Sequence, residues 1–516
     1  MKIAKYAFLA LFSFSLAVSC SRDNDPEPTP IVPVTETPDE INDFVWKAMN
    51  SWYYWQPNVA NLADSKKLNL AEYLNLINNK TPDKLFYSLL YNYGTTDRFS
   101  WIENNNEIVS SKNANLRAES ITGLDFTAFA KGQNSNNYVV FVNYVVPNSS
   151  ADAAGIKRGD VITKINGSYI NESNYPNFFS DSFSVTRAET TELSVVNNYY
   201  VITTTDKNEN LAITKTDVEE SPIAYYKTFD LDNKKIGYLV FNSFNIDYNS
   251  QLNAKFAEMK SAGITELILD LRYNGGGSLT TALGLGQMIT GGYTGQPYVY
   301  MKFNSKNANY SGFDNLSKEI EIYKTVDGHP EKTGEVQNIN SLFLPKVYIL
   351  VSHMSASASE LTTIALKKYI NVEVIGYPTA GKFVGSHTLY DSPNNNYISF
   401  ENRNRNHNWS LQPITFEYFN KNQEPNPIST ALGREAITPD YRVHPYEWIN
   451  NVKEFGNTTD PDLNKALELI LGRTVSRTAK SAQNLDYQFK QLPTYENTSK
   501  GLYISNLEEH LESRKK

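Results

Sequence analysis

The sequence predicts a multidomain α/β protein, and three observations support that class. The chain has 516 residues, more than the roughly 250–300 at which a single hydrophobic core stops growing. Apolar residues recur at helical intervals up to about residue 118, and from about residue 119 they follow the period of strands. Beyond about residue 221, predicted strands alternate with predicted helices. That alternation is typical of an α/β layer with a largely parallel sheet.

The first 37 residues predict a leader followed by a tether. Met1–Lys5 is positively charged, and Tyr6–Val18 is an apolar run of signal-peptide length. Cys20, the only cysteine, cannot form an intramolecular disulfide, and its position resembles that of the lipidated cysteine in a bacterial lipoprotein signal. We therefore expect a signal peptide over residues 1–19, a disordered tether over 20–37 and a lipid anchor to a membrane of the bacterial cell envelope, facing the periplasm or the surface. The alternative is an ordinary signal peptide with an incidental cysteine.

Residues 38–118 predict a small helical domain. Thr37, Pro38 and Glu40 combine a helix cap, a proline at the first helical position and a carboxylate in the first turn. Apolar residues follow at helical spacing from Ile41 to Trp52, and Thr81-Pro82-Asp83 repeats the start signal. We expect the aromatic residues of this domain to form its core rather than a ligand site.

Residues 119–220 predict a β-rich domain with a characteristic order of elements. A strand at Tyr138–Val146 is followed by a short helix ending at Gly155 and by a turn before the next strand. This order resembles a PDZ domain, most clearly in the segment Ala153–Asp160. The resemblance implies that a peptide adds to the sheet as a strand while a loop binds its terminal carboxylate. The residues that match this loop are Gly123, Leu124, Asp125 and Phe126. The alternative is a small β-domain that shares only the turn chemistry.

Residues 221–460 predict the α/β domain, and 461–516 a C-terminal helical tail. Two polar, asparagine-rich stretches, about 303–342 and 391–409, predict long surface loops or a small insertion. The predicted strands of the α/β domain are Ile236–Phe244, Glu266–Leu271, Val347–Ser352 and Val372–Gly376.

Ser357 lies where a predicted buried strand passes into a helix. The segment Ser355–Glu360 follows that strand directly and opens the helix. Unpaired N–H groups and the helix dipole favour developing negative charge at such a position, which suits a nucleophile. Taken alone, however, a serine there is an ordinary helix cap.

Lys382 follows a second predicted strand in the segment Gly376–Lys382, 25 positions after Ser357. Together the two segments resemble the C-terminal processing peptidases, also called tail-specific proteases. The resemblance implies a catalytic domain of the crotonase-like or ClpP-like type, in which Ser357 is the nucleophile and Lys382 the general base. Because a free lysine has a pKa of about 10.4, burial must lower that pKa before the amine can accept the serine proton. The implied intermediate is an acyl-enzyme.

The segment Asp270–Gly277 resembles the Asp-Leu-Arg-x-Asn-x-Gly-Gly motif of the same family. The resemblance implies an oxyanion hole formed by the N–H of Gly276 or Gly277 with that of Ala358. Ala436–Asp440 also resembles the segment that closes the family's catalytic domain. Without the family context, the three glycines are compatible with a simple helix-entry turn.

Two positions depart from the family pattern. Many members have a glutamine four residues after the lysine, where this chain has Ser386, and some have an acidic residue where it has Lys368. Ser386 is therefore only a possible third catalytic position. His353 and His387 flank the two motifs, so a Ser-His mechanism is an alternative.

Charge and motif content narrow the function further. The formal net charge is −8 and no basic run is present, which argues against a nucleic-acid partner. Metal-ligand clusters and phosphate loops are missing from the sequence, so no cofactor is predicted. We expect a serine endopeptidase of the cell envelope that acts on proteins or peptides with accessible C-termini. The alternatives are a peptide-binding scaffold lipoprotein that has lost turnover, and a glycan-binding surface protein suggested by the tyrosine and tryptophan content.

Overall fold

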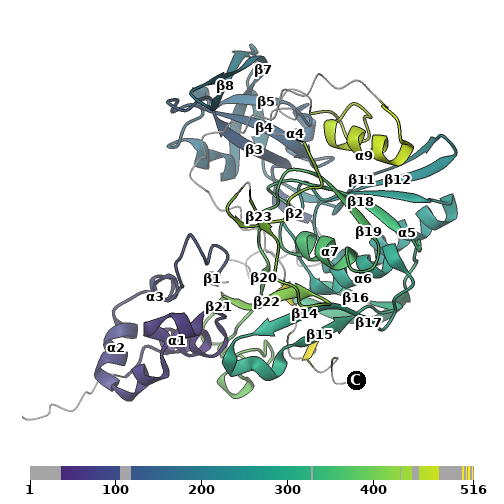
Figure 1. Cartoon of the computed structure of the whole chain (residues 1–516). Helices are drawn as coiled ribbons and strands as arrows, with labels where there is room; N and C mark the ends of the chain where they lie inside the picture. The colour runs from purple at the N-terminus through teal and green to yellow at the C-terminus, as the bar shows by residue number, and fades with distance from the viewer. Residues whose placement is uncertain are drawn as a thin grey trace, which may run out of the picture. The chain divides into compact units, whose positions relative to one another are not determined.

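The computed structural model describes most of the chain from residue 37 onward (Figure 1). The predicted signal peptide, Cys20 and nearly all of the predicted tether lie outside the described residues. None of the described helices is long and apolar enough to cross a membrane. The described residues are 37–104, 118–326, 329–430, 432–443, 452–475, 503, 504, 507, 510, 511 and 514.

The N-terminal region is helical, as predicted. Its helices are α1 (Glu40–Trp52), α2 (Leu70–Asn78) and α3 (Pro82–Ser88), with 3-10 turns at Gln56–Asn58, Ala60–Leu62 and Asp64–Leu68. Asp39, not Thr37, caps α1, because its side chain accepts the N–H of Asn42 at 2.9 Å. The buried face of α1 belongs to the same hydrophobic core as the α/β domain.

The second region is a seven-stranded antiparallel sheet with its own hydrophobic core. Its strand order is β3 (Leu124–Ala130), β4 (Tyr138–Val145), β5 (Val161–Ile165), β7 (Ser182–Val196) and β8 (Tyr199–Asp206). β6 (Ser168–Tyr169) pairs with β5, and β9 (Leu211–Thr214) pairs with β7. The short helix α4 (Ser150–Ala153) and the 3-10 turn Tyr175–Phe179 complete the unit, and β2 (Ala118–Ile121) pairs with β10 (Thr216–Glu219) at its chain ends.

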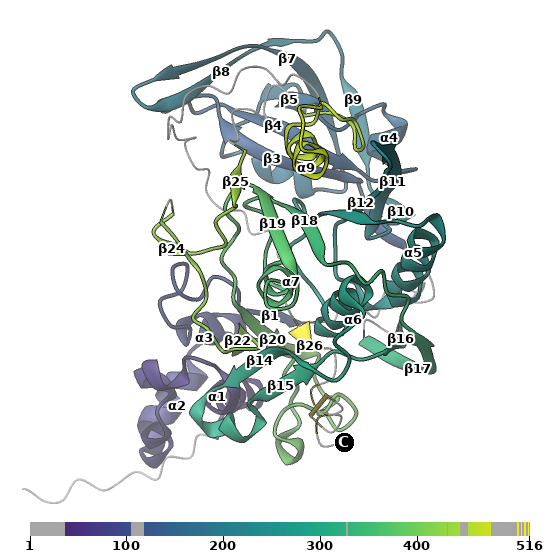
Figure 2. The ribbon, with the colours of Figure 1, turned by 45° about the vertical axis from the view of Figure 1, so that its right-hand side comes forward.

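The α/β region contains a six-stranded sheet in which β12 to β25 run parallel. Its order is β11 (Ile223–Leu231), β12 (Lys234–Phe241), β13 (Glu266–Asp270), β18 (Lys346–Val351), β19 (Asn371–Gly376) and β25 (Tyr441–Arg442). Alternate residues of each strand point to opposite faces. One face packs on α5 (Asn249–Ala262), α6 (Leu279–Thr290) and α7 (Ala358–Leu366), and the other on α9 (Pro461–Leu471) (Figures 1 and 2). The predicted multidomain α/β class is confirmed.

A second, five-stranded sheet supports the same helices. Its order is β15 (Gly312–Asn315), β14 (Pro297–Phe303), β22 (Ile414–Asn420), β20 (Val384–His387) and β26 (Tyr503–Ile504). β1 (Trp101–Asn104) of the N-terminal region pairs antiparallel with β21 (Trp409–Gln412). The remaining elements are β23 (Ile428–Ser429), β24 (Arg434–Glu435) and the 3-10 turns Ile246–Tyr248, Ser305–Tyr310 and Pro393–Asn395.

Of the two alternatives predicted for residues 303–342, the long surface loops are wrong, whereas a small insertion stays a prediction. That stretch contains β15 and the hairpin of β16 (Glu319–Val326) and β17 (His329–Asn338). Ile320 and Ile322 alternate with polar residues along β16 and are buried in the main core. The polar composition of the stretch concealed this two-residue period. Residues 391–408, by contrast, hold only one short 3-10 turn.

Candidate active site

Ser357 is the N-cap of α7, in the connection that follows β18. Its side chain is buried, and its backbone has φ 60° and ψ −110°. A helix cap ordinarily takes an extended conformation, and a positive φ in a non-glycine residue costs about 1–3 kcal/mol. Helix capping alone does not require this strain, so the conformation indicates a position held for a further purpose.

Lys382 lies in the connection between β19 and β20 and is only 4% exposed. Burial lowers the pKa of its amine to about 8; nearby Arg98 acts in the same direction, while the carboxylates of Asp97 and Glu360 oppose it. The Nζ atom lies 4.7 Å from the centre of the Phe99 ring. The amine is therefore far more easily deprotonated than that of an exposed lysine.

Glu360 joins the Ser357 and Lys382 segments. Its Oε2 atom accepts the backbone N–H of Ser357 at 2.9 Å and that of Lys382 at 2.8 Å. The two nitrogens are thus no farther apart than the sum of these distances. Its Oε1 atom accepts the N–H of Gly381 at 2.8 Å and the hydroxyl of Thr379. Burial raises the pKa of the Glu360 carboxyl, although these donors favour its ionised form.

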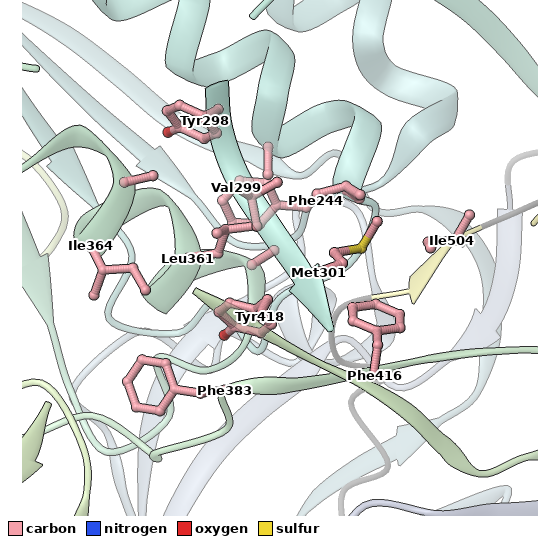
Figure 3. Close-up of a cluster of buried hydrophobic side chains, with 14 of the residues drawn as sticks. Phe244, Tyr298, Val299, Met301, Leu361, Ile364, Phe383, Phe416, Tyr418 and Ile504 are labelled. Carbon is pink, nitrogen blue, oxygen red and sulfur yellow. The ribbon is translucent and has the colours of Figure 1, made fainter. Parts of the chain in front are cut away.

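Tyr418 of β22 also contacts both segments, and it belongs to the core that Figure 3 shows. Its hydroxyl is 2.8 Å from the carbonyl oxygen of Ser357 and 2.7 Å from that of Lys382. Burial raises the pKa of the phenol well above its usual value, so it remains a protonated donor. Its ring packs against that of Phe383, with the centroids 6.0 Å apart.

The glycine turn approaches the start of α7 closely at one of the two predicted positions. Gly276 has φ +111°, and a Cβ there would lie 2.8 Å from Ser357 Cβ and 3.0 Å from the Ala358 nitrogen. Its own N–H donates to Asn274 Oδ1 at 2.9 Å. Gly277 instead lies against Phe244, where a Cβ would be 2.4 Å from the carbonyl oxygen. Gly276 is therefore the glycine that the structure places beside Ser357 and Ala358.

The charged residues that precede this turn hold it in place. Arg272 is buried and donates to Asp270 at 2.7 Å, to Asp462 at 2.7 Å and to Asp460 at 3.0 Å. The two latter residues belong to the start of α9. Moving Arg272 away from these partners would leave buried charges uncompensated, which is costly. The network therefore holds the start of the turn against β13 and α9.

The remaining predicted positions lie around this centre. Ser386 is on β20, and its hydroxyl accepts a hydrogen bond from Gln412 Nε2 at 2.9 Å. His387 Nδ1 lies 2.8 Å from Thr415 Oγ1, and burial lowers the pKa of its ring to about 3. Its Nε2 has no hydrogen-bond partner among the described residues. His387 is therefore not bonded to Ser357. His353 as a residue is exposed to solvent, although neighbouring chain around its ring and the charge of Arg434 lower the pKa of the imidazole to about 4. Lys368 pairs with Glu424.

The predicted carboxylate-binding loop lies at the start of β3. Gly123 has φ +78°, and a Cβ there would collide with the side chain of Ser149. Leu124 and Phe126 pack against the core of the β-rich region, Phe126 on Phe178 with ring centres 4.8 Å apart. Asp125 accepts the amide of Asn143 at 2.9 Å, and burial raises the pKa of its carboxyl to about 6.

Two contacts connect this β-rich region to the candidate active site. The amide of Asn143 lies 3.6 Å from the sulfur of Met354, which is in the connection before Ser357. The Arg158 guanidinium donates to the Tyr273 hydroxyl at 2.6 Å, next to the glycine turn.

The sequence did not predict five residues of the site, namely Asp97, Phe99, Glu360, Gln412 and Tyr418. Of these, only Glu360 had a signal in the sequence, since it ends the Ser355–Glu360 segment.

A helical N-terminal region, a PDZ-like domain and an α/β domain with these segments define a multidomain protease fold. Residues 235–425 match the family model described as peptidase family S41, residues 40–101 the S41 N-terminal domain and residues 141–177 a PDZ domain. Residues 235–425 therefore form a domain of peptidase family S41, and the predicted relationship to the tail-specific proteases is confirmed.

Individual relatives agree with this assignment. A probable CtpA-like serine protease of Staphylococcus aureus (strain bovine RF122 / ET3-1) is 26% identical over 266 residues, which is 52% of this chain and 46% of the relative. The corresponding protein of Staphylococcus epidermidis is 24% identical over 51% of this chain and 46% of the relative. The chain thus spans about half the length of the curated relatives it matches.

A solved structure shows the same fold. The crystal structure of a putative S41 protease from Bacteroides fragilis NCTC 9343 has a TM-score of 0.59 and 20% sequence identity, and the match covers 83% of this chain and 97% of that one.

Proposed function

We propose that the chain is a serine endopeptidase in which Ser357 is the nucleophile and Lys382 the general base. One observation carries the proposal: the two backbones share the anchors Glu360 and Tyr418, and the buried amine of Lys382 has a pKa of about 8. Membership of family S41 and the names of the staphylococcal relatives support the same activity.

The chemistry follows from the groups present. The neutral Lys382 amine takes the proton of the Ser357 hydroxyl as its oxygen attacks the carbonyl carbon of the scissile peptide bond. The tetrahedral oxyanion is stabilised by the N–H of Ala358 and by a backbone N–H of the Gly276–Gly277 turn. Because Gly276 has no side chain, this turn can lie close to Ser357 and Ala358. The C–N bond then breaks as Lys382 returns the proton to the leaving amine. Water hydrolyses the resulting acyl-enzyme by the same route.

Substrate selection is assigned to the PDZ-like domain. The peptide C-terminus binds beside Gly123–Phe126, and the contacts of Asn143 with Met354 and of Arg158 with Tyr273 connect that domain to both sides of the proposed site. The substrates are proteins or peptides with accessible C-termini. Ser386, bonded to Gln412, is at most a supporting position.

The activity is tested with the soluble form beginning at Pro38, since residues 38–516 form one compact unit. Wild type is expected to cleave casein, whereas Ser357→Ala and Lys382→Ala are inactive. Equal cleavage by all three proteins would exclude the proposed site. If wild type fails to cleave but still binds a C-terminal peptide, the scaffold alternative, motivated by Ser386, replaces it.

We also propose that Cys20 carries a lipid that anchors the chain to a membrane of the cell envelope. The signal-like leader and the position of Cys20 support this placement. Labelled fatty acid should be incorporated by the full-length chain and lost in Cys20→Ala. Labelling that persists in the variant would refute the anchor.

A further inference from the structure

The turn Asp97–Ser100 of the N-terminal region meets the proposed general base. The ring of Phe99 lies 4.7 Å from Lys382 Nζ, and the guanidinium carbon of Arg98 lies 4.6 Å from the centre of the same ring. Arg98 also donates to the carbonyl oxygen of Ala380, two residues before Lys382, at 3.4 Å. The side chain that contacts the functional nitrogen thus comes from outside the α/β domain.

Asp97 fixes the shape of this turn. It is fully buried, and its Oδ1 accepts the N–H groups of Phe99 at 3.1 Å and Ser100 at 3.0 Å. Its Oδ2 accepts the hydroxyls of Ser100 at 2.6 Å and Tyr53 at 2.7 Å. Tyr53 follows α1 directly, so the turn is tied to the helical region.

The other end of the turn is tied to the second sheet. The hydroxyl of Ser100 accepts the N–H of Ile414 at 2.9 Å, and the next residues form β1, which pairs with β21. Phe99 is therefore held between two fixed points. These contacts fix the position of the Phe99 ring relative to Lys382, which a mobile surface turn would not do.

The positive charges of Arg98 and Lys382, which lie beside the same Phe99 ring, repel each other. At neutral pH a guanidinium retains its proton, whereas an amine can release one. The repulsion is therefore relieved when Lys382 becomes neutral, which is the form a general base requires. The face of the ring attracts a cation, but the ring also removes water from one side of the amine, and burial is the largest cause of the lowered pKa, so the loss of water dominates and the charged form is disfavoured.

We propose that Arg98 and Phe99 belong to the active site as positioning residues: Phe99 forms a wall against Lys382 Nζ, and Arg98 favours the unprotonated amine. The inference rests on the proposed function, because it assigns Lys382 the role of base. It makes the N-terminal helical region part of the catalytic machinery.

Several charged groups face this site and must be considered together. Asp97 and Glu360 favour the protonated amine, and Arg98 disfavours it. Arg434 donates to the Ala380 carbonyl oxygen beside Arg98, and Glu435 follows it on β24. Arg98 is the cation among them that lowers the pKa of Lys382, so the experiment changes the charge at position 98.

The test measures casein cleavage against pH for wild type, Arg98→Gln and Arg98→Lys. Arg98→Gln should move the rising limb of kcat/KM to higher pH, and a move of one unit lowers kcat/KM at pH 7 about tenfold. Arg98→Lys keeps the charge and should keep the limb near its wild-type position. Arg473→Gln, which removes an arginine paired with Asp232 at 2.7 Å, is the matched control and should leave the limb unchanged.

A second variant tests the wall independently of charge. Phe99→Ala admits water to the amine, so the limb should also move to higher pH, with kcat falling more than KM rises. An unchanged limb in both Arg98→Gln and Phe99→Ala would overturn the inference, as would an equal shift in Arg473→Gln. Activity in Ser357→Ala, measured alongside, would instead defeat the proposed function itself.

Discussion

The hydroxyl of Tyr418 lies 2.7 Å from the carbonyl oxygen of Lys382, and the same hydroxyl reaches the carbonyl oxygen of Ser357 at 2.8 Å. Glu360 completes the arrangement from the other side, where one of its oxygens accepts both backbone N–H groups. The backbone of each residue is thus held at its N–H by Glu360 and at its carbonyl oxygen by Tyr418. Two loops distant in sequence are fixed to each other without using either functional side chain.

Tyr418→Phe should lower kcat about tenfold and leave KM close to wild type. The variant keeps the ring but removes a donor from two buried carbonyl oxygens, at a cost of about 1 kcal/mol in the free energy of unfolding. Initial rates over a range of casein concentrations, with a thermal melt, measure both effects. Tyr298→Phe, in the same hydrophobic core, is the matched control and should keep full activity. Wild-type kcat in Tyr418→Phe would show that the hydroxyl does not position the site.

Gly276→Ala should reduce casein cleavage at least about a hundredfold. Its Cβ would lie 2.8 Å from Ser357 Cβ, a distance that forces one backbone to move. An alanine at φ +111° is also strained, so a control must separate the two effects. Gly295→Ala has φ +80° with nothing within 4 Å of the added Cβ, and should remain active. Equal losses in both variants would assign the effect to backbone strain alone.

The pH dependence of kcat/KM should rise with a midpoint near pH 8. The neutral amine of Lys382 is the active form, and its fraction grows as the pH passes through the lowered pKa. Cleavage rates of the wild-type protein between pH 6 and 9.5 give the midpoint directly. A midpoint near 6.5 would point to a histidine as base instead.

The stability of the wild-type protein relative to Lys382→Met should increase with pH above about 8. In that window the unfolded lysine, with its ordinary pKa of 10.5, binds more protons than the folded one. The free energy of unfolding therefore rises with pH for wild type, and the methionine variant lacks this contribution. Urea titrations of both proteins at several pH values between 7 and 10 measure the difference. A difference that stays constant over this range would contradict a lowered lysine pKa.

The two central residues could be predicted because their motifs are local. Ser357 and Lys382 each follow a buried strand, and short segments carry the family resemblance. Since parallel strands end at the same edge of a sheet, β18 and β19 bring these segments together. The order of the domains was equally visible, because the hydrophobic period changes near residue 119.

The supporting residues could not be predicted in the same way. Tyr418 acts through a hydroxyl 61 and 36 positions from its two partners, and nothing near it in the sequence marks that role. Phe99 reaches Lys382 with the help of the pairing of β1 with β21, two segments about 300 residues apart in the sequence. The β16–β17 hairpin was concealed by its polar composition, although the isoleucines of β16 alternate as a strand requires.

The pairing of β1 with β21 has a consequence for the order in which the site forms during synthesis. Translation supplies the Asp97–Ser100 turn early and the strand that secures it some 300 residues later. Until those later strands are made, the turn has its contacts with Tyr53 but lacks those with Ile414 and β21, and Tyr418 is absent. The proposed site is therefore complete only after β22 (Ile414–Asn420) has been synthesised.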